Sequence, residues 1–306
     1  MITSVRLPNI TNEYLNNTKV VTYLSTNKTS FENTLKLTTI PKKDIFITVD
    51  LAADKNLHLT NPNITVFDKA VMDSVYTLFV YGETTFTPEM IVRIMTGNRL
   101  QDVRKRKAQD VTDSLIKLSL IRITIDCTDE FRTRNLISKN REVKLTSYVM
   151  PVREIEVLSA NHKTVMKGFQ LLEKPVLYSY AEQVNQIISV PTSILATNRI
   201  ISDTNDNIIL KRSLIQRIET MKNTKNKIKS KSIIYERTDK ETGKTKGFFE
   251  SLGFIEENYS NWKKKKNNLH KSIISILDCF KEENYIKSYE IIKKGKQKIL
   301  GISVDV

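Results

Sequence analysis

The chain has 306 residues, of which 40% are hydrophobic, and this is typical of about two globular domains with ordinary cores. Lys and Arg number 49 against 34 Asp and Glu, so the net charge of +15 indicates a polyanionic partner, nucleic acid before an anionic membrane surface. No run of 18 apolar residues and no signal-peptide core is present, so we exclude a membrane-spanning protein and expect a cytoplasmic one.

The first third of the chain contains a polar lead-in followed by helices. Residues 1–43 are rich in Asn, Thr and Ser, and we expect a poorly ordered or loosely packed N-terminal segment. Apolar residues alternate over 44–51, which indicates a strand. A helix is predicted over about 65–82, where the apolar spacing is helical. Thr87 and Pro88 supply an N-cap and a first helical position, so a short helix should run from there to Gly97.

Basic residues crowd the start of a third helix, predicted over about 101–118. A strand at 120–127, a charged loop at 129–141 and a returning strand at 142–158 should follow it. Three short helices and a hairpin are typical of a winged helix, so we assign residues 44–160 to a first winged-helix domain. The candidate DNA-binding residues on the third helix are Arg104, Lys105, Arg106 and Gln109.

Residues 161–190 are interpreted as a bridge to a second domain. The next helix should be capped by Asp206, with Leu210, Leu214 and Ile218 in its buried stripe and Lys211 on its outer side. The run 222–231 holds five lysines and no acidic residue. A strand at 232–236 and a short helix at 247–252 are predicted after it.

The clearest amphipathic helix lies between residues 262 and 280. Its apolar residues form one stripe, and the opposite side carries groups that suit phosphates and base edges. Strands are predicted at 285–292 and 297–304, joined by a turn that contains a glycine and three lysines. A basic helix followed by a basic-tipped hairpin is typical of the recognition helix and wing of a winged helix, which we place in residues 191–306. The candidates here are Lys263, Lys264, Lys265, Asn267, Asn268, Lys271, Lys293, Lys294 and Lys296.

The fold class is therefore predicted to be α+β, with two tandem winged helix-turn-helix domains. A solvated surface is the alternative explanation for the lysine-rich helix face. The chain is rich in Lys, Asn and Ile throughout, which AT-rich coding DNA alone can produce. The sequence leaves both explanations open.

Side chains for catalysis or metal binding are widely separated. The three histidines, His58, His162 and His270, do not form a pair, and Cys127 and Cys279 lie far apart in apolar surroundings. Gly243-Lys244-Thr245 lacks the earlier glycine of a phosphate-binding P-loop. We expect reduced, buried cysteines, no catalytic residue, no metal and no cofactor.

Two stretches resemble a known family. Residues 64–75 (Ile-Thr-Val-Phe-Asp-Lys-Ala-Val-Met-Asp-Ser-Val), with Phe-Thr-Pro-Glu-Met at 86–90 and Gly97, look like the first winged helix of plasmid replication initiators, the Rep proteins of iteron plasmids. Asn-Ile-Ile-Leu-Lys-Arg-Ser-Leu-Ile-Gln-Arg-Ile-Glu at 207–219 looks like the opening helix of their second winged helix. The resemblance covers about residues 45–306. The long lead 1–43 and the loop 129–141 have no counterpart in it.

The resemblance implies two winged helices that bind successive turns of direct repeats in double-stranded origin DNA. Monomers would open the origin, and self-association as a dimer would repress the chain's own gene. Host replication initiation and helicase-loading proteins would be partners in a bacterial, DNA-associated setting. It also implies that the major groove is read by Lys105, Arg106, Gln109, Lys264, Asn267, Asn268 and Lys271.

Physical chemistry agrees with these roles. A helix fits the major groove, Asn can bond adenine, and flanking Lys263, Lys265 and the wing lysines would contact phosphates. We therefore predict a DNA-binding replication initiator without enzymatic activity. A winged-helix transcription regulator or plasmid partition protein is the alternative, and a strand-nicking replication enzyme is a second one.

Overall fold

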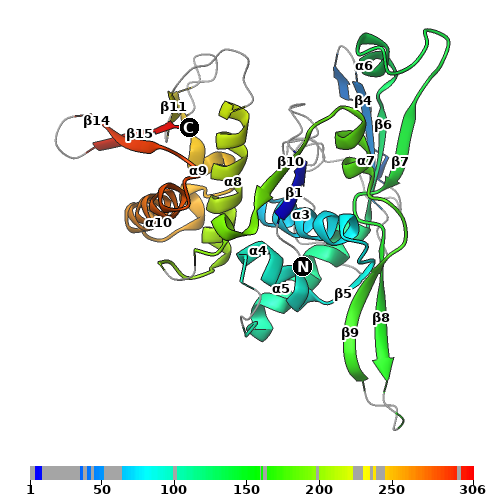
Figure 1. Ribbon diagram of the computed structural model, residues 1–306, viewed down its shortest axis with the longest axis horizontal. Coiled ribbons are helices and arrows are strands. Elements are labelled where there is room, and N and C mark those ends of the chain that lie inside the picture. Colours follow the sequence, from blue (N-terminus) through cyan, green and yellow to red (C-terminus); the bar gives the residue numbers. More distant parts are fainter. Residues whose placement is uncertain are drawn as a thin grey trace. The chain divides into compact units, whose positions relative to one another are not determined.

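The computed structural model is an α+β protein (Figure 1). It divides into two compact units: Met1–Ile64, Val71–Arg93 and Gln101–Ser189 form unit 1, and Thr65–Ala70, Ile94–Leu100 and Val190–Val306 form unit 2. None of the helices that the structure describes is long and apolar enough to cross a membrane. The residues described are 4–8, 35–36, 40–42, 45–51, 64–98, 102–158, 160, 164–197, 200–222, 230–234, 237–238, 245–294 and 298–306.

Local sequence signals set the ends of the first helices. Helix α3 (Val66–Val80) begins after Thr65, whose hydroxyl accepts from the Asp68 N–H at 3.1 Å while the Asp68 carboxylate accepts from the Thr65 N–H at 2.6 Å. Helix α4 (Pro88–Thr96) has proline at its first position and ends at Gly97, with φ +67°. Both predictions are confirmed. Helix α5 (Lys105–Ser119) begins later than expected, at the N-cap Arg104.

The hairpin that follows these helices is not the one predicted. Strands β8 (Val152–Leu158) and β9 (Thr164–Leu171) pair with each other, and β9 also pairs with the two-residue strand β5 (Thr85–Phe86), so the sheet order is β5–β9–β8. The predicted returning strand 142–158 is wrong, because residues 149–151 interrupt it and separate two sheets. Strand β9 falls within residues 161–190, the predicted bridge.

A second sheet of unit 1 combines strands that precede α3 with two strands that lie between α5 and β8. Its order is β2–β4–β6–β7, with β3 also paired to β4. The chain turns from β6 into a short helix where the sequence had indicated only a charged loop. The bounds are β2 (Leu35–Lys36), β3 (Ile40–Lys42), β4 (Ile45–Leu51), β6 (Ile121–Asp126), α6 (Thr128–Thr133) and β7 (Lys144–Tyr148).

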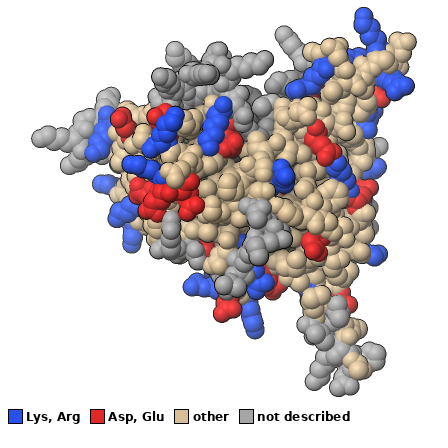
Figure 2. Space-filling model, in the orientation of Figure 1, with Lys and Arg blue, Asp and Glu red and all other residues tan. Residues whose placement is uncertain are grey.

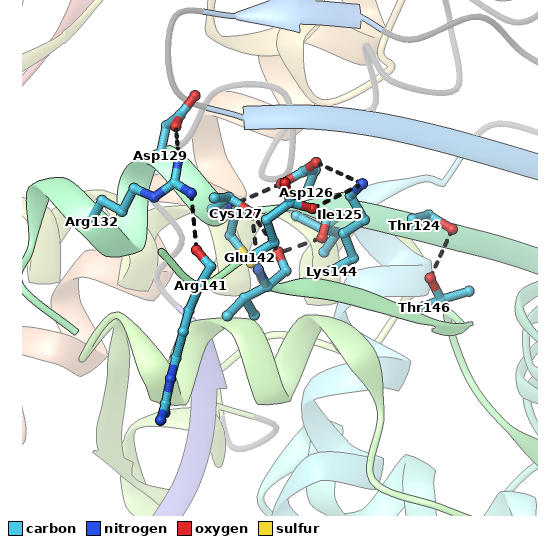
Figure 3. Close-up of polar contacts among 12 residues, drawn as sticks. Thr124, Ile125, Asp126, Cys127, Asp129, Arg132, Arg141, Glu142, Lys144 and Thr146 are labelled. Atoms are coloured by element: carbon cyan, nitrogen blue, oxygen red, sulfur yellow. Dashed lines mark hydrogen bonds and ion pairs between the residues drawn. The ribbon is translucent and has the colours of Figure 1, made fainter. Parts of the chain in front are cut away.

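Polar contacts hold the connection between β6 and β7 together (Figure 3). Arg132 bonds the Asp129 carboxylate at 3.2 Å and the Arg141 carbonyl at 3.0 Å, which ties α6 to the loop that follows it. Lys144 Nζ lies 3.6 Å from Asp126 Oδ2 across the sheet. These bonds explain why a charged segment forms an ordered turn of helix rather than an open loop.

Residues 4–8, within the segment 1–43 that was expected to be poorly ordered or loosely packed, form a packed strand. Strand β1 (Ser4–Pro8) pairs with β10 (Ile187–Pro191), and its Val5 and Leu7 side chains are buried. The β1 strand also contacts α7 (Val176–Gln183). The rest of 1–34 lies outside the described residues.

Unit 2 contains the clearest amphipathic helix. Helix α10 (Trp262–Glu282) buries Leu269, Ile273, Ile276 and Phe280, as its periodicity predicts, and it packs on α8 (Asn205–Lys222). Strand β15 lies between β11 and β14 in the sheet. The remaining bounds are η1 (Thr192–Leu195), β11 (Ser230–Ile234), β12 (Arg237–Thr238), β13 (Thr245–Lys246), α9 (Phe248–Ser251), η2 (Glu256–Asn258), β14 (Ser288–Lys294) and β15 (Lys298–Asp305).

One order of elements occurs twice in the chain. It is helix, strand, helix, helix, strand, strand, and in both cases the last strand is central in a three-stranded antiparallel sheet. The first occurrence is α3, β5, α4, α5, β8 and β9, and the second is α8, β11, α9, α10, β14 and β15. The first is interrupted after α5 by an insertion of β6, α6 and β7, and the second contains β12 and β13 before α9 and η2 before α10.

Candidate nucleic-acid interface

The start of α10 presents a continuous polar surface. The Asn261 side chain caps the helix by accepting from the Lys264 N–H at 2.9 Å. Successive positions three and four apart then lie on one side of the helix. We call the exposed residues on this side the basic face of α10: Lys263, Lys264, Asn267, Asn268 and Lys271.

The charges on α10 are segregated along its length. Its first turn contains no acidic residue, although the positive end of the helix dipole favours one there. Lysines at this end repel each other and the dipole, so an external anion would stabilise them. Asp278 and Glu282 lie in the second half of the helix. In Figure 2, Lys and Arg are spread over both units. Many acidic residues instead gather in one cluster over the part of unit 2 that contains α8, α9 and α10.

Lys265 does not belong to the basic face, although the sequence suggested it as a phosphate contact. Its ammonium group forms an ion pair with Asp206 at the start of α8, and its side chain is only 20% exposed. Neighbouring Lys266 is also partly buried. The run of four lysines is therefore divided between an outward pair, Lys263 and Lys264, and an inward pair.

Strands β14 and β15 extend beside α10 and carry the remaining candidates of unit 2. Tyr289 on β14 donates its hydroxyl to Asp278 Oδ1 of α10 at 2.6 Å. Burial and this carboxylate raise the pKa of Tyr289 to about 12, so the phenol stays a donor at neutral pH. Lys293 is exposed at the end of β14. The side chain of Lys294 and the whole of Lys296 lie outside the described residues.

Helix α5 presents a second basic group in unit 1. Arg104, Lys105 and Arg106 are exposed around its first turn, which has neither an acidic residue nor a side-chain cap. The free N–H groups and the dipole at this end attract anions, as the three side chains do. Gln109 differs from them, because its Nε2 donates to Asp113 Oδ1 at 2.8 Å.

Sequence reasoning missed the basic residues of the β8–β9 hairpin. Arg153 donates to Gln170 Oε1 at 2.9 Å from Nε and 2.6 Å from a terminal nitrogen. Lys167 pairs with Glu156 at 2.7 Å, and this hydrogen bond raises the pKa of the lysine. Apolar and polar residues alternate only over Phe169, Gln170 and Leu171, which is a weak signal for this strand.

One lysine of α8 that was expected to face solvent is buried. Lys211 is 1% exposed, and its Nζ donates to the Leu195 carbonyl at 2.7 Å and lies 3.1 Å from Asp203 Oδ1. Burial lowers its pKa, and the Asp203 carboxylate opposes that shift. The prediction failed because the helical spacing of 211 places it beside the core, where these two oxygens replace water.

Nothing among the described residues resembles a metal site or an activated nucleophile. No group of three or more His, Cys, Asp or Glu that could hold a metal occurs in the part of the chain described. Cys127 and Cys279 are buried, as predicted, and they do not form a disulfide. Burial and the neighbouring Glu130 raise the pKa of Cys127 to about 12, so its thiol stays protonated.

No protein-family model and no curated protein matches the chain. Among solved structures, it is similar to domains 2 and 3 of RctB in a crystal structure of selenomethionine derivatives, with a TM-score of 0.41, 11% identity, and coverage of 91% of this chain and 92% of that one. A second crystal structure, RctB residues 155–483 comprising domains 2–3, gives a TM-score of 0.38, 11% identity, and coverage of 91% and 93%. Such scores do not establish a shared fold, and the proposals below rest on this chain's own residues.

Proposed function

We propose that the chain is a sequence-specific double-stranded DNA-binding protein. The observation that carries this proposal is the basic face of α10, where five exposed Lys and Asn side chains lie without any acidic neighbour in the first turn. An exposed α-helix has the width to enter the major groove. There an asparagine amide can bond adenine on two atoms, and a lysine can bond the acceptors of guanine or a phosphate.

The order of elements supports a winged helix-turn-helix interpretation of both copies. In each copy, a helix, a short strand and two further helices precede a hairpin whose last strand is central. In this interpretation α10 and α5 are the recognition helices, and the β14–β15 and β8–β9 hairpins are the wings. Lys263 and Lys293 would contact phosphates in unit 2, as Arg104 would at the start of α5.

The role we propose for this DNA binding is initiation of plasmid replication at direct repeats, with repression of the chain's own gene by dimers. Two winged helices in one chain can bind successive turns of DNA, and the sequence resembles iteron-binding initiators at 64–97 and 207–219. Host initiation and helicase-loading proteins are the partners of this role. The proposal involves no strand cleavage and no cofactor.

Salt dependence tests the DNA-binding proposal. Fluorescence anisotropy would follow the full chain binding a random duplex of about 20–30 base pairs. If the two helices and wings neutralise about 6–10 phosphates, affinity should fall about 10³–10⁵-fold between 50 and 200 mM salt. A flat response would reject the proposal.

The initiator role needs a different measurement. Selection from a random duplex library would yield an enriched site, and repeats of that site would be placed in a supercoiled plasmid beside an A·T-rich tract. We expect permanganate-reactive thymines in that tract with an intact backbone, in the presence of Mg²⁺ and without ATP. Binding without melting would favour the regulator or partition alternative. A nicked circle with protein attached to a 5′ end would instead favour the nicking enzyme.

A further inference from the structure

Lys265 is held inside unit 2 by a carboxylate and by aromatic rings. Its ammonium pairs with Asp206, whose side chain is 39% exposed, while that of Lys265 is 20% exposed. The same Nζ lies 4.7 Å from the centre of the Tyr259 ring and 5.4 Å from that of Phe254. A cation over two ring faces gains stabilisation that grows as water is excluded.

These rings continue to the first residue of α10. Tyr259 stacks on Trp262, with centroids 5.8 Å apart and planes at 26°, and Trp262 meets Phe249 edge-on at 6.4 Å and 89°. We call Phe249, Phe254, Tyr259 and Trp262 the aromatic box. It draws side chains from α9, the turn after it, the end of η2 and the start of α10. Lys265 connects the box to Asp206 of α8.

We propose that Lys265 is a positioning residue for DNA recognition and does not contact DNA. It holds the first turn of α10 against α8, so that Asn267 and Asn268, on the same turn and the next, meet the bases in one geometry. Transfer of its ammonium to a phosphate would break the ion pair and both ring contacts, whereas Lys263 gives up no described partner. Asp206 also offsets one of the four positive charges at the helix start. This inference rests on the proposed function.

The experiment compares the parent chain with Lys265→Met, which keeps an unbranched side chain one atom shorter and removes its charge. Affinities would be measured over a salt series for the enriched duplex and for a scrambled duplex of the same composition. We expect Lys265→Met to weaken binding of the enriched duplex about tenfold, as loss of a base contact would, and to leave the scrambled duplex and the salt slope unchanged. Lys263→Met is the matched control, and it should weaken both duplexes and shallow the slope by about one.

Two further variants separate positioning from loss of folding. Asp206→Asn is nearly isosteric and should reproduce the loss of discrimination, although Asp206 carries no positive charge for DNA. Lys265→Arg should restore discrimination, because a guanidinium can pair with the carboxylate and stack on Tyr259. Trp262 is the only tryptophan, so its emission without DNA should change in Lys265→Met and Asp206→Asn and return in Lys265→Arg.

The outcomes distinguish this inference from the proposed function. If Lys265→Met shallows the salt slope by about one while Asp206→Asn leaves discrimination unchanged, Lys265 is a phosphate contact and the inference is wrong, but the proposed function stands. If the parent chain binds neither duplex, both fail. If Lys265→Met unfolds, the other two variants test the inference. Asp206→Asn must then lose discrimination between the two duplexes, and Lys265→Arg must retain it.

Discussion

Asn268 is the residue whose replacement tests base recognition most directly. It is exposed in the middle of the basic face of α10, and its amide offers both a donor and an acceptor. We expect Asn268→Ala to cost about 1–3 kcal/mol of binding free energy on the enriched duplex and little on scrambled DNA. Asn140→Ala, an exposed asparagine of unit 1, is the control and should change neither. Equal losses on both duplexes would mean that Asn268 does not read bases.

His270 makes the stability of unit 2 depend on pH. Burial lowers its pKa below the ordinary value of 6.5, so the unfolded chain binds the proton more tightly than the folded one. Stability should therefore be full above about pH 6.5 and should fall as the pH drops from there toward the lowered pKa. Urea unfolding of the parent and of His270→Gln across pH 5–8 would measure this, and the parent should lose more stability toward acid. If the unfolding free energies of the two proteins change equally with pH, the prediction is wrong.

At the scale of the element, Gly97 controls how α4 ends. Its φ is +67°, and a Cβ built on it would lie 2.5 Å from the Thr192 carbonyl oxygen and 2.8 Å from the Ala196 nitrogen, both backbone atoms of unit 2. The strain of a left-handed alanine alone costs about 1–3 kcal/mol of stability. Gly97→Ala adds this clash to that strain, so its cost should be larger. Thermal or urea unfolding would measure the loss.

Gly253 supplies a matched control for this prediction. Its φ is +88°, but nothing lies within 4 Å of its virtual Cβ. Gly253→Ala therefore carries the backbone strain alone and should cost about 1–2 kcal/mol. Equal costs for the two variants would show that the close approach of α4 to η1 contributes nothing.

The elements that the sequence predicted well are those whose signal is local. The apolar period of α10 and the caps of α3 and α4 depend on residues within a few positions of each other. Strand β5 has only two residues, and β9 alternates apolar and polar residues only over 169–171, so neither has a strong local signal. Helical phase places Lys265 on the side of Leu269, but its partner Asp206 lies 59 residues away in the chain, so the ion pair has no local signal.

On the scale of the whole molecule, the exposure of the α10 residues was easier to predict than the architecture of the first unit. The exposed face of α10 follows from helical phase alone, which separates Asn268 from Leu269 without knowledge of the fold. Within the insertion, strand β6 and part of β7 were predicted, but α6 was not, and neither was the sheet that β6 and β7 join, which differs from that of the hairpin that follows. The predicted wing of strands 120–127 and 142–158 is not the hairpin that pairs with β5, because long-range packing decides that pairing.

The insertion also has a consequence for how the protein is made. Thr85 of β5 pairs with Gln170 of β9, so β5 leaves the ribosome several seconds before its partner, given about 5–20 residues translated per second. A fragment ending at residue 160 lacks β9 and should aggregate or unfold without cooperativity, whereas one ending at residue 197 should melt cooperatively. Circular dichroism of both fragments would check this, and a cooperative shorter fragment would contradict it. During synthesis, the nascent chain should depend on chaperones until β9 emerges.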